Sequence, residues 1–97
     1  MRTLPPDAPA RRAATPLHLA AARAVMRLFI SEDLAHGVSP TSQLFCCACQ
    51  SRRPMPGFVQ YGESQLCNDC ATEYEVLRIA GIFETVDQYL LEANPAG

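Results

Sequence analysis

The chain has 97 residues, 48% of them hydrophobic, with ten acidic residues, eight basic residues and a net charge of −2. A chain this short forms at most one small domain, whose core stabilises the fold only weakly without a metal or disulfides. No stretch approaches the roughly 20 apolar residues of a membrane-spanning helix. The basic residues are all arginines and lie mostly before residue 54, whereas acids dominate after it. This imbalance disfavours nucleic-acid binding through the C-terminal half.

The N-terminal segment, residues 1–15, is rich in proline, alanine and arginine and has almost no large apolar side chain. We therefore expect a disordered tail there. Arg23 and Arg27 interrupt the one candidate for the apolar region of a signal peptide, so a cytoplasmic location is expected. A targeting peptide within residues 1–30 stays open, because Asp7 is the one acid of this arginine-rich stretch.

Residues 16–37 are predicted to form an amphipathic helix. Thr15 followed by Pro16 is typical of a helix start. Apolar residues recur at helical spacing, and this stripe consists of Ala22, Val25, Met26, Phe29 and Ile30. The stripe indicates either a core helix packed on the rest of the domain or a face, Ala22–Ile30, that binds a partner or forms a homodimer.

Two cysteine pairs lie in the middle of the chain. Each is a C-x2-C motif, and seventeen residues separate Cys46 and Cys49 from Cys67 and Cys70. Two thiolate pairs on tight turns can close a tetrahedron around Zn²⁺, so we predict one structural zinc ion held by these four cysteines. A redox-active dithiol pair is the alternative. Four thiolates leave no coordination position for a catalytic water, and we expect no enzymatic activity.

The fifth cysteine and the two histidines are weaker candidates for metal binding. Cys47 is expected to lie in the turn without binding the metal. The alternatives are that it replaces Cys46 as a ligand or that it is a reactive thiol. His18 and His36 both fall in the predicted N-terminal helix. We expect surface or helix-end roles for them, because four thiolates already complete the site.

The zinc-binding module is predicted to cover residues 38–94, with a tail at residues 95–97. Residues 39–44 are expected to form a connector, and residues 52–57 an irregular loop. A β-hairpin is predicted next, with strands at Phe58–Tyr61 and Ser64–Leu66.

Two helices are predicted to follow the hairpin. The first runs from the Cys67–Cys70 pair to about Ala80. The second begins at a capping-box pattern, Thr85-x-x-Gln88, and ends at Asn94. Its apolar face comprises Ile82, Phe83, Val86, Tyr89, Leu90 and Ala93. The order of knuckle, hairpin and helix predicts a small α+β domain of the treble-clef type, flanked by N- and C-terminal helices.

Arg52 and Arg53 follow the first cysteine pair directly, with Phe58 and Tyr61 a few residues further on. We predict that these four residues contact a partner. Docking on an acidic protein surface is the first hypothesis, and a small contact with single-stranded nucleic acid is the alternative.

The run Cys46–Arg78 resembles the zinc finger of DksA/TraR-type transcription regulators. The positions that match are Cys46, Cys49, Leu66, Cys67 and Cys70. The resemblance implies a zinc module that supports a helical part entering the secondary channel of bacterial RNA polymerase. The chain departs from that pattern at Gln50, where glycine is usual, and at residues 58–61, where the family has an arginine-rich strand. Glu32–Asp33 is the one candidate for the family's acidic tip.

The same cysteines are also similar to the N-terminal zinc module of ClpX-type unfoldases, a dimeric domain that binds adaptors and substrates. We therefore expect a cytoplasmic, bacterial or phage, non-enzymatic zinc protein that acts by binding another protein. RNA polymerase, or a component of a protease or unfoldase, is the expected partner. A nucleic-acid-binding zinc finger and a redox-sensitive zinc switch are the alternatives.

Overall fold

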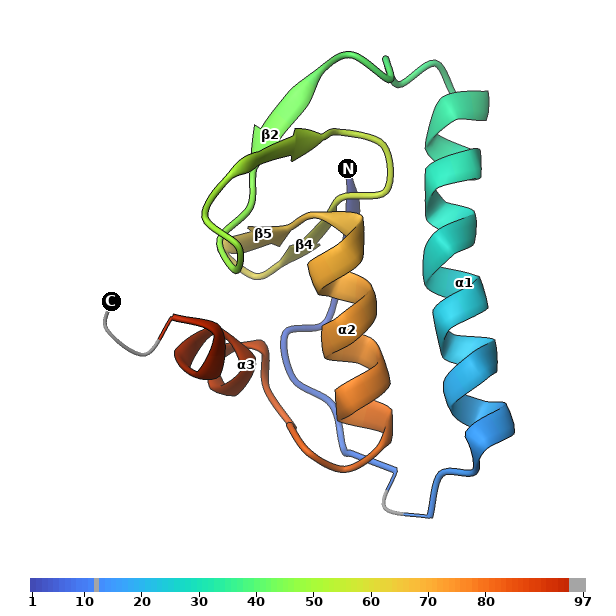
Figure 1. The fold of residues 1–97 in the computed structure, drawn as a ribbon, viewed down its shortest axis with the longest axis vertical. Coiled ribbons are helices and arrows are strands. Elements are labelled where there is room, and N and C mark those ends of the chain that lie inside the picture. Colours follow the sequence, from blue (N-terminus) through green and yellow to red (C-terminus); the bar gives the residue numbers. More distant parts are fainter. Residues whose placement is uncertain (12, 95–97) are drawn as a thin grey trace.

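The computed structural model describes residues 1–11 and 13–94 of the chain. These residues form a small α+β fold of three helices and two small sheets around a cluster of four cysteines (Figure 1). The body is flat, with extents of 37 × 33 × 18 Å, and its first helix lies along one edge. Residues 95–97, predicted to be a tail, lie outside the described residues.

The helices lie where the sequence predicts them, as does the β-hairpin. The helices are α1 (Pro16–Ala35), α2 (Asn68–Ile79) and α3 (Val86–Ala93). The strands are β1 (Arg2–Leu4), β2 (Gln43–Phe45), β3 (Arg52–Pro54), β4 (Val59–Tyr61) and β5 (Ser64–Leu66). β4 and β5 pair antiparallel across a two-residue turn that contains Gly62, whose φ is 58°.

Two of the helices begin with complete capping boxes. Thr85 accepts a hydrogen bond from the backbone N–H of Gln88, whose side chain accepts one from Thr85 in return, as the sequence predicts. At the start of α1, Thr15 accepts from the backbone N–H of His18, and Nδ1 of His18 accepts from the Thr15 N–H at 3.2 Å. A histidine thus takes the place that glutamate or glutamine usually holds in this motif.

The core lies between α1, α2 and the β4–β5 hairpin (Figure 1). α1 contributes Met26 and Phe29 to it, so part of the predicted stripe is a core face. Three tyrosine rings continue the core toward α3. Tyr61 meets Tyr74 edge-on with ring centroids 5.2 Å apart, and Tyr74 lies 5.6 Å from Tyr89. The predicted helix is present, and its stripe packs on the domain only in part, because Val25 is 50% exposed. Partner binding through Ala22–Ile30 stays a prediction.

The N-terminal segment differs from the expected disordered tail. β1 pairs parallel with β4, from Arg2 opposite Val59 to Leu4 opposite Tyr61. Farther on, the backbone N–H of Val86 donates to the Pro6 carbonyl at 2.8 Å, and the Ala8 N–H donates to Glu84. This segment joins the central sheet to the start of α3 by backbone hydrogen bonds, in which Pro6 takes part only as an acceptor. Such bonds do not require large apolar side chains, so the composition of the segment does not reveal them.

A second sheet lies where the sequence predicts a connector and an irregular loop. β2 and β3 pair antiparallel, with Gln43 opposite Pro54 and Phe45 opposite Arg52. Each strand is three residues long, too short for a hydrophobic alternation to show. Proline fits at Pro54 because it ends a strand at the edge of a two-stranded sheet.

Candidate metal centre

The first cysteine pair lies on the tight turn between β2 and β3. The backbone N–H of Cys46 donates to the Ser51 carbonyl at 2.9 Å, and the Gln50 N–H donates to the Cys46 carbonyl at 2.9 Å. Gln50 adopts a left-handed conformation with φ of 54°, which a glycine adopts without strain. This backbone geometry explains why glycine is the usual residue at this place in the motif.

The second cysteine pair lies where β5 passes into α2. Cys67 is the N-cap of the helix with extended backbone angles, and Cys70 lies in its first turn. The Cys67 carbonyl accepts a hydrogen bond from the Ala71 N–H at 2.8 Å. Both sulfurs therefore lie near the N-terminal end of a helix, where backbone N–H groups favour negative charge.

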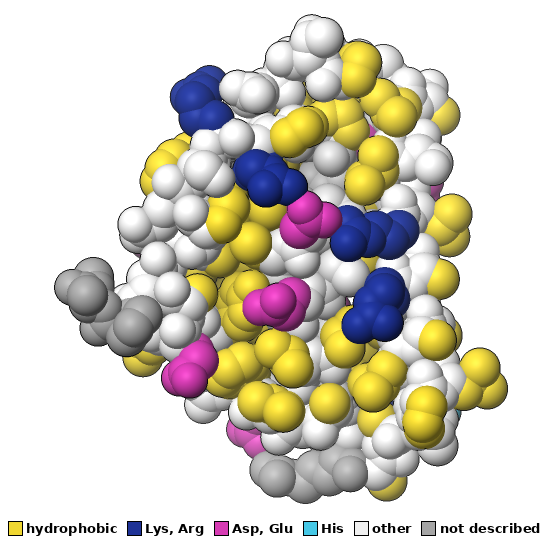
Figure 2. Space-filling model, in the orientation of Figure 1, with side chains coloured by type: hydrophobic (Ala, Val, Ile, Leu, Met, Phe, Trp, Pro, Cys, Tyr) yellow, Lys and Arg dark blue, Asp and Glu magenta, His cyan; other side chains and the backbone are white. Residues whose placement is uncertain are grey.

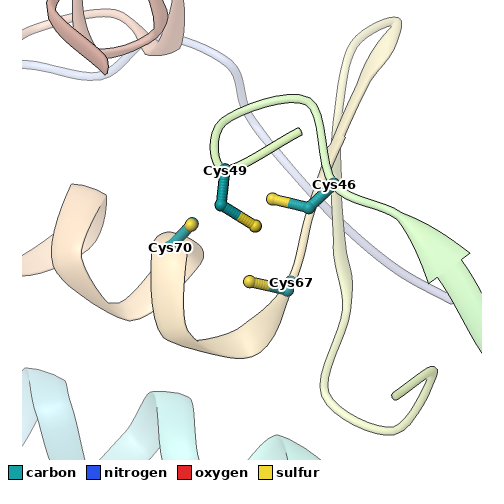
Figure 3. A group of neighbouring side chains, drawn as sticks. All are labelled: Cys46, Cys49, Cys67 and Cys70. Carbon is teal, nitrogen blue, oxygen red and sulfur yellow. The ribbon is translucent and has the colours of Figure 1, made fainter. Parts of the chain in front are cut away.

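The four sulfurs converge on one point between the turn and the helix start (Figure 3). All four Sγ atoms lie within 4.8 Å of one another. A zinc ion with Zn–S bonds of about 2.3 Å sets its sulfurs about 3.8 Å apart in a tetrahedron, so the cluster fits a zinc-sized ion with little adjustment. The predicted grouping of Cys46, Cys49, Cys67 and Cys70 is confirmed as a site that can bind a metal ion.

Crowding four thiols makes their ionisation interdependent. Hydrogen bonds from Cys67 and then Cys70 lower the pKa of Cys46, while the hydrogen bond that Cys67 makes to Cys46 raises the pKa of Cys67 to about 11. Hydrogen bonding to Cys46 likewise raises the pKa of Cys70. A bound dication compensates the repulsion between thiolates, so metal binding here is coupled to the release of protons.

Two arginines lie beside the cysteine cluster. Asp69, between Cys67 and Cys70 in the sequence, accepts hydrogen bonds from Arg27 at 2.6 Å and from Arg53. The hydrogen bond from Arg27 is the main reason that the pKa of Asp69 is lowered, and Arg53 adds to this effect. Electrostatic interaction with Cys67, and to a smaller extent with Asp69, raises the pKa of Arg53. Zinc with four thiolates carries two net negative charges, and Arg53 is placed to offset part of that charge.

Asn68 connects the metal centre to α1. This residue is buried directly after Cys67, and its side-chain N–H₂ donates to the Met26 carbonyl at 2.8 Å and to the Gly57 carbonyl at 3.1 Å. Gly57 fits only as glycine, because a Cβ there would lie 2.5 Å from Ile30 and φ is 86°. The buried Asn68 side chain therefore links α1 and the loop that contains Gly57 to the start of α2.

The remaining cysteine and the histidines lie outside the four-sulfur cluster. The backbone of Cys47 makes two hydrogen bonds: its N–H donates to the Gln65 carbonyl at 2.9 Å, and its carbonyl accepts from the Asn94 side chain at 3.2 Å. His18 completes the cap of α1, and Nδ1 of His36 lies 2.7 Å from the Glu32 carbonyl at the other end of that helix. These positions agree with the bystander and helix-end roles expected from the sequence.

Two of the four predicted partner-binding residues are core residues. Phe58 and Tyr61 are each 1% exposed, and the Tyr61 hydroxyl donates to Glu75 at 2.8 Å, so as placed neither can stack on a partner. Phe58 directly precedes β4 and Tyr61 ends it, and both are buried in the core, whereas Gln60 between them is half-buried. An apolar run this short does not reveal which of its aromatic residues are buried. Arg52 is exposed and Arg53 is partly exposed.

An exposed aromatic residue that the sequence reasoning passed over lies beside Arg52. Phe45 is 47% exposed and stands directly opposite Arg52 in the β2–β3 ladder. Cross-strand partners have their side chains on the same face of a sheet. Phe45 directly precedes the first cysteine pair. This position is the one feature of the sequence that could have indicated an exposed aromatic residue beside the metal centre.

No family model, curated protein or solved structure matches this chain. Among the helices within residues 1–11 and 13–94, none combines the length and apolar character needed to cross a membrane. The functional conclusion therefore depends on the geometry of the cysteine cluster and on the surfaces around it.

Proposed function

We propose that this chain is a non-enzymatic protein-interaction domain held together by one structural zinc ion in a treble-clef arrangement. The observation that carries the proposal is the convergence of four sulfurs from a strand–turn–strand unit and a helix start. Tetrahedral tetrathiolate sites suit zinc, and four protein ligands fill its coordination sphere. The metal then acts by fixing surfaces rather than by chemistry of its own.

The arginine surface is the face that we assign to the partner. It comprises Arg23 and Arg27 of α1 together with Arg53 of β3. Figure 2 shows arginine side chains spread across this face, with acidic side chains lying among them. The side chain of Arg27 is 47% exposed and that of Arg53 is 40% exposed, although both contact Asp69. Guanidinium groups held at a surface favour carboxylate-bearing partners.

An acidic protein surface is therefore the partner chemistry that we propose. Bacterial RNA polymerase is the first protein to test, because the resemblance of the cysteine motif to DksA/TraR-type regulators points to it. The zinc-loaded chain would be titrated into purified RNA polymerase core enzyme and its binding followed by biolayer interferometry. We expect the Arg27→Ala, Arg53→Ala double variant to bind at least about tenfold more weakly, which corresponds to about 1.4 kcal/mol.

Arg11→Ala is the control matched in charge to each single variant, Arg27→Ala or Arg53→Ala, because Arg11 is an exposed arginine that lies outside this surface. The control should bind as the unchanged chain does. If Arg11→Ala weakens binding as much as Arg27→Ala or Arg53→Ala does, the effect comes from net charge alone. That result would contradict the assignment of the partner to the arginine surface. Surface ion pairs contribute about 0–1 kcal/mol. Arg27 also donates to Asn68 Oδ1 at 2.8 Å, so circular dichroism and metal content verify that the double variant remains folded.

Single-stranded nucleic acid is the second candidate ligand, because Phe45 and Arg52 form an exposed aromatic–arginine pair on the β2–β3 ribbon. Such a pair can stack a base and contact a phosphate. Fluorescence anisotropy with a labelled single-stranded oligonucleotide tests it. Salt-sensitive binding that Phe45→Ala abolishes would favour nucleic acid, and absence of binding would exclude it.

A further inference from the structure

A small hollow lies between α2 and α3. Its volume is about 160 Å³. Pockets that bind small molecules usually have volumes of about 300–1,000 Å³, so this hollow suits a single side chain of a partner protein rather than a free ligand. We call it the α2–α3 hollow, and its lining residues are Glu73, Leu77, Phe83, Tyr89, Glu92 and Ala93.

The wall of the α2–α3 hollow is apolar and partly aromatic. It consists of Leu77, Phe83 and Ala93. Phe83 is half-buried and meets Tyr89 edge-on, with ring centroids 5.9 Å apart, and this contact holds its ring in place. Such a wall can cover the methylene stem of a long side chain, and an aromatic ring attracts a cation placed over its face.

Two exposed carboxylates, those of Glu73 and Glu92, also line the hollow. Glu73 accepts a hydrogen bond from the Tyr89 hydroxyl at 3.0 Å, which is an uncharged donor and leaves the negative charge of Glu73 uncompensated. Within residues 1–11 and 13–94, no arginine pairs with Glu73 or Glu92. Arg78 contacts Glu75 at 2.6 Å instead, and no basic residue follows Arg78 in the sequence. The charge of the hollow is therefore available to a cation from another molecule.

The chemistry of the hollow favours an arginine side chain over a metal ion. Among the residues that the structure describes, the four cysteines are the group that could hold a metal ion, and neither Glu73 nor Glu92 belongs to it. Two carboxylates beside an apolar wall offer fewer oxygen ligands than Ca²⁺ or Mg²⁺ requires. A guanidinium is planar and carries five N–H donors, so one arginine can stack on Phe83 while it pairs with the carboxylates.

The α2–α3 hollow borders the arginine surface. A neighbouring hollow between α1 and α2 is lined by Arg23 and Arg27, and the two hollows share Glu73 and Leu77. Figure 2 shows acidic side chains among hydrophobic ones beside the arginines of this face. A protein that covers the arginine surface therefore also reaches the α2–α3 hollow, which adds to that interface and need not supply a whole one.

We propose that the α2–α3 hollow binds an arginine side chain of the protein whose acidic surface docks on the arginine surface. This assignment rests on the proposed function, because it names a second contact with the same partner. Arginines that fill pockets are among the residues that contribute most to protein–protein binding. Contacts of opposite sign on one face fix the orientation of the partner, since a reversed partner would place like charges together at both sites.

Nuclear magnetic resonance titration of the zinc-loaded chain with N-acetyl-arginine amide tests the hollow. At physiological ionic strength we expect saturable shifts of the Phe83, Tyr89 and Ala93 signals, with a dissociation constant in the millimolar range. N-acetyl-citrulline amide, which has nearly the same shape but no charge, should give no saturable shift. An equal response to N-acetyl-lysine amide would contradict the choice of arginine, because an ammonium group does not stack on a ring as a guanidinium does.

Glutamine variants test the two carboxylates. Glu73→Gln and Glu92→Gln should each weaken binding of the arginine derivative at least about twofold, the size expected for one exposed ion pair. Glutamine can still accept the hydrogen bond from Tyr89, and circular dichroism and metal content verify that the variants remain folded. Glu63→Gln is the control matched in charge, because Glu63 is an exposed glutamate in the turn between β4 and β5, and it should leave binding unchanged. Shifts that do not saturate, or equal weakening by Glu63→Gln, would overturn the proposal.

The titration separates the hollow from the proposed function, since no RNA polymerase is present in it. If the arginine derivative binds while Arg27→Ala and Arg53→Ala leave polymerase binding unchanged, the hollow is supported and the partner assigned to the arginine surface is contradicted. If polymerase binding depends on these arginines but the derivative does not bind, the partner is supported and the assignment of the hollow is contradicted.

Discussion

Replacing Asn68 by alanine should cost about 2–4 kcal/mol of unfolding free energy. Asn68 is buried, and its side-chain amide donates to the Met26 and Gly57 carbonyls at 2.8 and 3.1 Å. An ordinary hydrogen bond contributes about 0.5–1.5 kcal/mol, and each buried group left unpaired costs about 1–3 kcal/mol. The Met26 carbonyl lies inside α1 and keeps its helical partner, whereas the Gly57 carbonyl loses its partner. Arg27 and Thr72, which donate to Asn68 Oδ1 at 2.8 and 3.4 Å, each lose an acceptor as well.

Urea unfolding of the zinc-loaded protein, followed by circular dichroism at a fixed zinc concentration, measures this cost. The variant should retain its zinc, because the cysteines are unchanged. Gln60→Ala is the matched control, since this side chain also donates to a backbone carbonyl, that of Gly62 at 2.7 Å, but does so on the surface. The control should change stability by no more than about 0.5 kcal/mol. A loss below about 1 kcal/mol for Asn68→Ala would refute the linking role of this residue.

Three further changes test the rest of the fold. Gln50→Gly should raise the unfolding free energy by about 0.5–1 kcal/mol in the same assay, because φ of 54° disfavours a side chain; no gain would contradict this strain. Burial raises the pKa of Tyr74 to about 12, above the unfolded value of about 10. The stability that the neutral phenol contributes is therefore complete below about pH 10 and is lost as pH rises toward 12. Melting temperatures across this range should fall, and Tyr74→Phe should make the fall shallower. Part of it should remain, because burial also raises the pKa values of Tyr61 and Tyr89. Cys47→Ser should keep one metal ion per chain by native mass spectrometry, whereas Cys46→Ser should lose it; the reverse result would exchange their roles.

The parts of the fold that the sequence predicts are those that carry local signals. The three-residue spacing of Thr85 and Gln88 predicts a helix start, and both hydrogen bonds of that capping box are present. The hairpin of β4 and β5 follows from the turn residue Gly62 after the β-prone run Phe58–Tyr61. The cysteine cluster follows from the spacing of two pairs, because tight turns present both sulfurs of a pair to one ion.

The parts that the sequence does not predict depend on contacts between distant segments. β1 joins β4 across more than half of the chain, and nothing within Arg2–Leu4 indicates a strand. Phe58 and Tyr61 follow the arginine loop closely in sequence and could be read as surface aromatics, yet both are buried in the core.

X-ray absorption at the zinc edge, combined with elemental analysis of the purified chain, tests the central claim most directly. The four converging sulfurs predict one zinc ion per chain with four sulfur ligands at about 2.3 Å. Chelation of that zinc should unfold the domain, because binding to thiolates contributes on the order of 10–16 kcal/mol in small zinc domains. Nitrogen or oxygen in the first coordination shell, or a chain that stays folded with no metal, would contradict a structural tetrathiolate zinc site.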